Sequence, residues 1–160
     1  GLDGVPTGRI VLLKAYDEYG FYFYTNYLSD KGRAIEAYDK VSLSFFWPSL
    51  ERQIIIKGKA SKTSKDTSKR YFDSRPLGSR LGAILSKQSQ VIENRKILDK
   101  MLKDLEKVYQ DKDPELPEYW GGYLVSPVSI EFWQGRPNRL HDRIRYTLDD
   151  LDWKLERLSP

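Results

Sequence analysis

The sequence contains no cysteine, one histidine and one methionine among its 160 residues. The absence of cysteine excludes disulfides and thiolate metal sites. A single histidine argues against a metal centre built from protein side chains, so we expect no metal ligands. No apolar run exceeds four residues. A run of that length is too short to cross a bilayer, so we expect no membrane association.

The first eight residues are short and polar, and they resemble neither a signal peptide nor a transit peptide. Because the chain does not begin with Met, we expect a leader segment to precede Gly1. These features predict a soluble cytoplasmic protein, with organelle targeting left open by the absent leader. A length of 160 residues predicts a single domain, residues 1–160, that buries a core of its own.

The charge balance is mildly basic, with 27 Lys and Arg against 23 Asp and Glu, which gives a net charge of +4. This excess suits an anionic small molecule as well as nucleic acid, but no long basic run is present, so nucleic acid is the weaker alternative. Aromatic residues make up 13% of the chain. That fraction favours β structure and flat-ring ligands.

The hydrophobic pattern predicts strands first, then helices, then strands again. Alternating or β-branched runs predict strands over residues 9–15, 21–26, 41–47, 52–63, 121–127, 128–135, 143–148 and 152–158. A turn joins the first two at Asp17–Gly20, and Gly58 is expected to bend the fourth. Helices are expected over 30–38, with Ser29 or Asp30 as N-cap, and over 66–74, 79–85 and 94–110. This order favours an α+β fold, mainly an antiparallel barrel, over a parallel βαβ sheet.

No glycine-rich phosphate loop is present, so a phosphate would be bound by side chains. Arg9 and Lys14 bracket the first predicted strand and would point to opposite faces, each serving a different group. The alternative is that they flank a buried strand without a ligand. Tyr71, Arg75 and Ser79 recur every four residues and form a possible phosphate clamp, or else an exposed helix end.

Two further segments have polar patterns with a possible ligand. Gln88 and Ser89 lie in a polar loop before a helix, where they would bind a phosphate or a ribityl-type chain, unless the polarity is simply that of a loop. Arg139, His141 and Arg143 alternate after Trp133, and on an extended segment they would share one side. Such groups suit an anion or an electron-rich ring. The alternative is that Arg139 or Arg143 pairs with Asp142 or Glu131.

These segments, in this order, resemble the pyridoxine (pyridoxamine) phosphate oxidase family. The resemblance covers nearly the whole chain, through DGVPTGRIVLLK, FYFYTN, KGR, FFWPSLERQIIIKG, YFDSRPLGSRLGA, SKQSQVI, WGGY, IEFWQGRPNRLHDRIRY and WKLERLSP. The most specific parts are EFWQG through RLHDR, and SRP-x-x-S. The resemblance implies a split β-barrel with helices packed on it and flavin mononucleotide (FMN) at a homodimer interface. It also implies oxidation of pyridoxine or pyridoxamine 5'-phosphate to pyridoxal 5'-phosphate, with O2 reduced to H2O2.

The resemblance also implies a role for each matching residue. The implied cofactor contacts are Arg9, Ile10, Val11, Leu12, Leu13, Lys14, Tyr24, Thr25, Lys31, Gln53, Gln88, Ser89, Trp133 and Arg143. The implied substrate contacts are Lys14, Tyr71, Arg75 and Ser79 for the phosphate, and Arg139 and His141, also the implied catalytic residues, for the pyridine ring. We favour orientation over base catalysis for these two, because a guanidinium is a poor base at neutral pH.

Two features depart from the family pattern. The family has an Arg-Lys pair where this chain has Asp30-Lys31, and members carry a strand and a lid before the turn at which this chain starts. Three alternatives therefore stay open beside the oxidase. They are another flavin split-barrel protein such as a reductase or stress protein, a module that binds flavin or pyridoxal phosphate without turnover, and a nucleic-acid binder.

Overall fold

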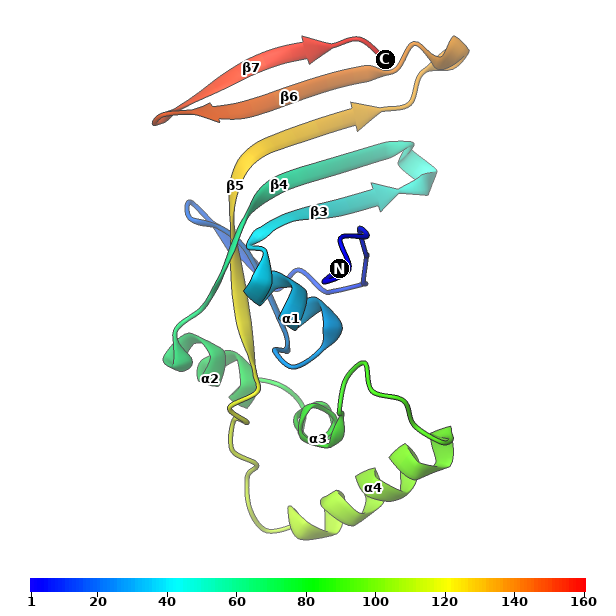
Figure 1. The fold of residues 1–160 in the computed structure, drawn as a ribbon, viewed down its shortest axis with the longest axis vertical. Helices are drawn as coiled ribbons and strands as arrows, with labels where there is room; N and C mark the ends of the chain where they lie inside the picture. The colour runs from blue at the N-terminus through cyan, green and yellow to red at the C-terminus, as the bar shows by residue number, and fades with distance from the viewer.

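The structure is a computed structural model that describes residues 1–160, and it contains one seven-stranded antiparallel sheet and four α-helices (Figure 1). The strands are β1 (Ala15–Asp17), β2 (Gly20–Asn26), β3 (Lys40–Trp47), β4 (Arg52–Lys62), β5 (Trp120–Gln134), β6 (Asp142–Asp149) and β7 (Asp152–Leu158). The helices are α1 (Asp30–Ala37), α2 (Lys65–Asp73), α3 (Leu77–Leu85) and α4 (Arg95–Val108), with short 3-10 turns at Pro48–Leu50 and Pro137–Arg139. Figure 1 shows α2, α3 and α4 together at one end of the sheet, with β6 and β7 at the other.

The long strand β5 organises the sheet, because it pairs with three other strands. One edge of β5 pairs with β4 along almost its whole length. The other edge pairs with β2 over residues 120–125 and with β6 over residues 129–134. The sheet therefore divides at the middle of β5, and the two halves curve apart (Figure 1).

The middle of β5 lies opposite Gly58, where the β4–β5 register shifts. A Cβ on Gly58 would lie 2.3 Å from the carbonyl oxygen of Ser126, so the backbones approach too closely for any other residue. The predicted bend at Gly58 is confirmed. The prediction of two separate strands around Pro127 is wrong, because Pro127 pairs with Gly58 at the bulge and β5 continues through it.

The helices and most strands are confirmed within one or two residues of their predicted bounds. Ser29 is the N-cap of α1, and its hydroxyl accepts a hydrogen bond from the Gly32 amide at 3.2 Å. The strand predicted over residues 9–15 is wrong for 9–14. That segment has only one backbone bond to a strand, from the Lys14 amide to Tyr22 O at 2.9 Å, and Ile10 is 97% exposed.

The core consists of two small clusters, one on each side of the β2–β5 pair. Phe23, Ala60, Tyr123 and Val125 form the first, and Phe72, Ala83 and Trp120 form the second. Only 20 of 160 residues are buried, so much of the apolar surface of a single copy stays open to solvent. No helix of the structure is long and apolar enough to cross a membrane.

Gly58→Ala should lower the free energy of unfolding by about 1–3 kcal/mol, because the added Cβ would collide with the opposite strand. Gly78→Ala is a matched control in α3, since nothing lies within 4 Å of a Cβ placed there. It should raise the free energy of unfolding by about 0.5–1 kcal/mol through helix propensity. Urea denaturation followed by circular dichroism measures both changes. A Gly58→Ala protein as stable as the unchanged one would contradict the steric account.

Candidate functional site

A cavity of about 550 Å³ lies between β2, the segment before β1, and the pair α2 and α3. We call it the anion cavity, because its lining holds three cations and no acidic residue. Several residues that the sequence singled out come together in its wall: Ile10, Val11, Leu12, Lys14, Tyr24, Thr25, Lys31, Tyr71, Arg75, Ser79 and Gln88. Leu13 and Arg9 line neighbouring pockets instead. Arg9 and Lys14 therefore line different cavities, as predicted. The reason is not strand alternation, because residues 9–14 form no strand.

A stack of aromatic rings forms one wall of the anion cavity. The Tyr24 and Tyr71 rings lie 3.8 Å apart between centroids, and the Trp120 ring is within 7° of parallel to that of Tyr71. The Arg75 guanidinium lies 4.8 Å from the centre of the Trp120 ring, and Lys14 Nζ lies 5.9 Å from that of Tyr71. Because ring faces attract cations, the stack holds two cations in place without a carboxylate.

Arg75 has a donor that the chain leaves unsatisfied. Its Nη1 is buried and makes no hydrogen bond, and no acidic residue forms an ion pair with its guanidinium. Burial lowers the pKa of Arg75, because it disfavours the charged form. A buried polar group without a partner is costly. This donor therefore fits an anion that enters from outside the chain, and a phosphate accepts from guanidinium donors readily.

Lys31, the first-turn lysine of α1, is a second uncompensated cation, and it lies on the Thr25–Gln88 side of the same cavity. Its ammonium group donates to three neutral oxygens, at 2.7 Å to Thr25 Oγ1, 3.2 Å to Ser29 Oγ and 2.5 Å to Gln88 Oε1. Burial lowers the pKa of Lys31, and nearby Arg9 lowers it further. Both effects would be relieved by an anion beside the ammonium group, so Lys31, its hydroxyl neighbours and Arg9 fit the phosphate of a mononucleotide.

Asp30, where the family pattern has arginine, does not leave a free carboxylate beside Lys31. Its Oδ1 accepts from Arg33 Nη2 at 2.8 Å, one turn further along α1. Its backbone amide donates to Ser89 Oγ at 3.1 Å, which ties the start of α1 to the loop before α4. Ser89 itself has a positive φ of 71° and lies outside the anion cavity. Arg33 thus neutralises the acidic departure from the family pattern.

A second group of predicted residues lies at the far end of β5, and we call it the distal cluster. Gln53, Trp133 and Arg143 are direct neighbours across β4, β5 and β6, so they form one row on the sheet. The His141 ring lies 4.8 Å from the Trp133 ring between centroids. Gln53 and Trp133 also line a cavity of about 510 Å³. The row offers a flat apolar ring between polar neighbours.

One expectation about the distal cluster was wrong, and one of the alternatives was confirmed. Arg139 does not lie on an extended segment with His141 and Arg143, because it ends the 3-10 turn with a φ of 61°. The alternative that Arg143 pairs with Glu131 is confirmed, with 2.8 Å between Arg143 Nε and Glu131 Oε1. Hydrogen bonding to Glu131 raises the pKa of Arg143. Arg139 forms no ion pair in the chain.

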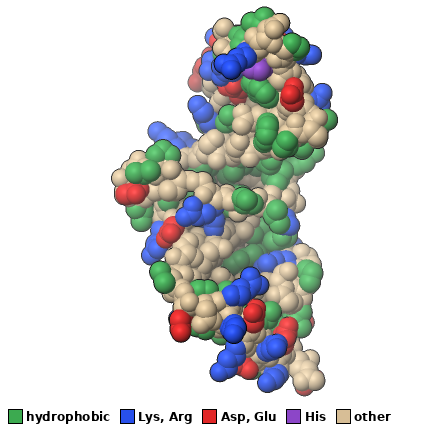
Figure 2. Space-filling view, turned by 90° about the vertical axis from the view of Figure 1, so that its right-hand side faces the viewer, with side chains coloured by type: hydrophobic (Ala, Val, Ile, Leu, Met, Phe, Trp, Pro, Cys, Tyr) green, Lys and Arg blue, Asp and Glu red, His purple; other side chains and the backbone are tan.

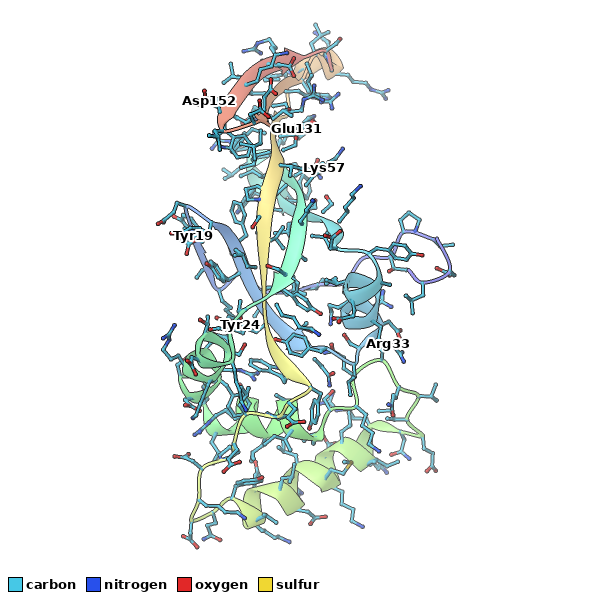
Figure 3. All side chains as sticks on the ribbon, turned by 60° about the vertical axis from the view of Figure 1, so that its left-hand side comes forward. Tyr19, Tyr24, Arg33, Lys57, Glu131 and Asp152 are labelled. Carbon is cyan, nitrogen blue, oxygen red and sulfur yellow. The ribbon has the colours of Figure 1, made fainter.

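The anion cavity and the distal cluster are far apart in one copy of the chain. The two cavities share no lining residue. Trp120 and Trp133 begin and nearly end β5, and a strand of that length spans up to about 45 Å. Figure 3 shows Tyr24 beside α2 and Glu131 near the opposite end, and Figure 2 shows the partly exposed single histidine next to cationic side chains at that end. One chain therefore does not bring the predicted residues together.

Sequence reasoning missed Trp120, whose ring holds Arg75, and Asp142, which anchors the loop around His141. Trp120 reads as the first residue of a strand, and nothing in its spacing connects it with Arg75. Asp142 was considered only as a partner for Arg139 or Arg143. Its actual partners are Arg136 and Arg157, each at 2.7 Å, and neither was assigned a role.

Comparison with known proteins gives matches along both parts of the chain. Residues 1–109 match the family described as pyridoxamine 5'-phosphate oxidase, and residues 120–160 match the pyridoxine 5'-phosphate oxidase C-terminal dimerisation region. The chain is 62% identical over 160 residues to the pyridoxine/pyridoxamine 5'-phosphate oxidase of Flavobacterium johnsoniae, covering 99% of this chain and 75% of the relative. The protein of that name from Pseudomonas fluorescens strain SBW25 is 51% identical over 158 residues, with coverage of 99% and 74%.

Solved structures agree with these matches. PhzG from Burkholderia lata 383, in complex with tetrahydrophenazine-1-carboxylic acid, superposes with a TM-score of 0.92 at 28% identity, covering 99% of this chain and 77% of that chain. An FMN binding protein from Nostoc punctiforme, related to pyridoxamine 5'-phosphate oxidase, shares the fold with a TM-score of 0.77 at 15% identity, with coverage of 99% and 82%. The predicted split barrel is therefore confirmed. From the family matches and the identity to its relatives, this chain belongs to the pyridoxine/pyridoxamine 5'-phosphate oxidase family.

Proposed function

We propose that this chain uses FMN to oxidise pyridoxine or pyridoxamine 5'-phosphate to pyridoxal 5'-phosphate, with O2 as the electron acceptor. The observation that carries the assignment is the buried, unpaired Nη1 of Arg75 in a cavity with three cations and no acidic residue. Two relatives that match almost the whole of this chain, at 62% and 60% identity, are named for this activity.

The substrate phosphate would bind at the Arg75 side of the anion cavity. Arg75, Lys14 and the hydroxyl groups of Tyr71 and Ser79 supply donors there. The aromatic stack fixes the two cations before the substrate arrives, so less ordering is required on binding. Binding energy from this remote phosphate would align the reacting carbon.

FMN would bind at the Lys31 side, with its phosphate on Arg9 and Lys31 and its chain near Thr25, Gln88 and Ser89. The ammonium group of Lys31 donates only to neutral oxygens, and burial together with Arg9 lowers its pKa more than Asp30 raises it, which supports an anionic occupant. Gln53, Trp133 and Arg143 would contact the flavin from the distal cluster. The bound FMN would supply the redox chemistry, as the acceptor of a hydride from the substrate and the donor of electrons to O2.

The complete site requires a second copy of the chain, with its distal cluster placed over the anion cavity of the first. A homodimer is indicated by the match of residues 120–160 to a dimerisation region. That region contains Trp133, Arg139, His141 and Arg143. The exposed apolar side chains of the sheet, such as Phe46 at 58% and Leu155 at 57%, support a partner that covers them. We also propose that residues 1–160 fold as one domain, because β5 joins the sheet strands from both matched parts.

Oxidation of either substrate would remove a hydride from C4′ and a proton from the adjacent hydroxyl or amine, while O2 is reduced to H2O2. With the hydroxyl, the product is the aldehyde directly. With the amine, the product is an imine, and water hydrolyses it to the aldehyde and ammonia. Arg139 and His141 would hold the pyridine ring in the orientation that this transfer needs. A guanidinium is a poor base, so Arg139 would contribute electrostatic orientation and not base catalysis.

The phosphate donors argue against an unphosphorylated ring as substrate. PhzG, at 28% identity, was solved in complex with tetrahydrophenazine-1-carboxylic acid, which carries no phosphate. Such a ligand would leave four phosphate donors without a role: Lys14, Tyr71, Arg75 and Ser79. A module that binds flavin or pyridoxal phosphate without turnover is the second candidate, and the release of H2O2 distinguishes the oxidase from it.

The FMN-loaded chain should release H2O2 when pyridoxine 5'-phosphate is added, and a peroxidase-coupled assay measures it. Arg139→Ala should lower kcat/KM by about 100-fold, because the ring loses its orienting cation, while FMN affinity changes less than about twofold. If the flavin-loaded protein shows no turnover, the oxidase assignment is wrong and the binding module is favoured. Equal losses of turnover and FMN affinity would contradict the role of Arg139.

Mixed dimers test whether two chains share each site. Arg75→Ala and Arg139→Ala should each be nearly inactive alone. Refolded together in equal amounts, half of the dimers would be mixed and would contain one intact site of two, so about one quarter of the full activity should return. Two Arg75→Ala preparations refolded together are the control and should stay inactive. A mixture as inactive as its components would show that each site lies within one chain.

Asp30 and Arg33 should have opposite effects on the binding of FMN. Arg33→Ala leaves the Asp30 carboxylate unpaired near the phosphate site, so FMN affinity should fall by about three- to tenfold. Asp30→Asn should leave it unchanged or raise it, and the double variant should resemble Asp30→Asn. Quenching of flavin fluorescence on titration gives each Kd. A loss in the double variant as large as in Arg33→Ala would mean that Arg33 itself binds the cofactor.

A further inference from the structure

The loop that joins β5 to β6, residues 135–141, has an unusual backbone. Asn138 and Arg139 have positive φ angles of 59° and 61°. Asparagine tolerates this conformation, but arginine adopts it rarely, because its Cβ crowds the backbone. Such a residue keeps a positive φ only where the surrounding structure holds it. The loop that carries Arg139 and His141 must therefore be fixed by contacts at its ends.

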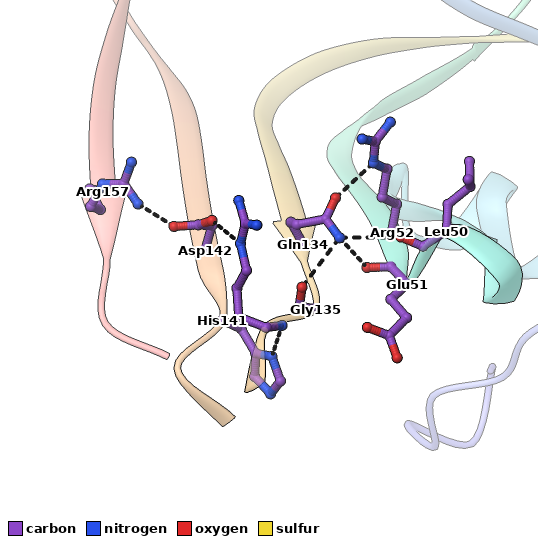
Figure 4. A network of polar contacts seen from close by, with 9 residues as sticks. Leu50, Glu51, Arg52, Gln134, Gly135, His141, Asp142 and Arg157 are labelled. Atoms are coloured by element: carbon purple, nitrogen blue, oxygen red, sulfur yellow. Dashed lines mark hydrogen bonds and ion pairs between the residues drawn. The ribbon is translucent and has the colours of Figure 1, made fainter. Parts of the chain in front are cut away.

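Gln134 fixes the first end of the loop, as Figure 4 shows. Its amide nitrogen donates to the carbonyl oxygens of Leu50 and Gly135, both at 3.2 Å. Its Oε1 accepts from Arg52 Nε at 2.7 Å. The Gly135 amide also donates to Glu51 O at 2.7 Å. The turn between β3 and β4 thus holds the start of the loop through the carbonyl oxygens of Leu50 and Glu51, and Arg52 of β4 adds a side-chain contact.

Asp142 fixes the other end, and it lies directly opposite Gln134 in the β5–β6 register. Its two carboxylate oxygens accept from two different arginines, Arg136 Nε at 2.7 Å and Arg157 Nη1 at 2.7 Å. Arg136 belongs to the loop and Arg157 to β7. These two hydrogen bonds hold the pKa of Asp142 below its usual range. Asp142 therefore connects the loop to the last strand of the sheet.

Arg136, the loop residue that Asp142 holds, also orients the ring of His141. The backbone amide of Arg136 donates to His141 Nδ1 at 3.1 Å. A nitrogen that accepts a hydrogen bond carries no proton, so the proton of the neutral ring lies on Nε2. His141 Nε2 makes no hydrogen bond within the chain. The ring thus has a satisfied acceptor on one side and a free donor on the other.

We propose that Asp142 is a positioning residue for His141. Its ion pairs with Arg136 and Arg157 keep the Arg136 amide on Nδ1, so the imidazole presents Nε2–H as a hydrogen-bond donor. A donor fits an oxygen of the substrate ring or its phosphate, and this last step rests on the proposed function. His141 then acts by holding the substrate, not by accepting a proton from it.

Nuclear magnetic resonance tests the positioning directly, because the chain has one histidine and its ring nitrogens need no further assignment. In the ¹⁵N-labelled protein, the Arg136 amide nitrogen and His141 Nδ1 should show scalar coupling across their hydrogen bond. Asp142→Ala and Arg136→Ala should each abolish it. Glu156→Gln is the matched control, because it breaks a 2.9 Å ion pair with Arg145 on the same two strands, away from the loop. The control should keep the coupling.

Steady-state kinetics with pyridoxine 5'-phosphate give the second readout. Asp142→Ala should raise KM about tenfold, the cost of one misplaced hydrogen bond, with kcat and FMN affinity nearly unchanged. Coupling that persists in both variants, or is absent from the unchanged protein, would overturn the proposal. Lost coupling with an unchanged KM would overturn the donor role of His141. If no variant turns over but the coupling behaves as described, the proposed function fails while the positioning by Asp142 stands.

Discussion

The pairing of β5 with three strands is the constraint on which the rest of the structure depends. Because one edge of β5 is shared between β2 and β6, the sheet divides at the bulge opposite Gly58. The division places Trp120 against Phe72 of α2 and Ala83 of α3, and Trp133 beside Arg143 of β6. Under the proposed function, the two parts of the site are therefore built at opposite ends of one strand. A second copy, related by the symmetry usual in dimers, can bring unlike ends together twice.

The anion cavity shows how positive charge can be held without acidic partners. Arg75 and Lys14 lie against ring faces, and Lys31 lies among hydroxyl and amide oxygens. Ion pairs with carboxylates would stabilise the empty chain more, but they would compete with a phosphate for the same donors. The chain thus keeps unsatisfied donors that only a bound anion completes, and ligand binding should stabilise the folded state accordingly.

Elements with local signals were predictable from the sequence. Ser29 as N-cap, the period of α4 and the glycine at the bulge are properties of a few neighbouring residues. Features that depend on distant partners were not. Residues 10–14 have the composition of a strand but lack a pairing partner, and composition does not report the partner. Trp120 and Arg75 meet only because β5 begins beside α2, so no spacing in the sequence connects them.

The distal loop shows why even the order of residues can mislead. Arg139, His141 and Arg143 alternate in the sequence, and alternation predicts a shared face only if the backbone is extended. The positive φ of Asn138 and Arg139 breaks that condition. The flanking residues Gln134 and Asp142 make the break possible, since each ties its end of the loop to a different part of the sheet. A loop held in this way before the ligand arrives needs little further ordering on binding, so its rigidity supports the proposed orientation of the substrate by Arg139 and His141.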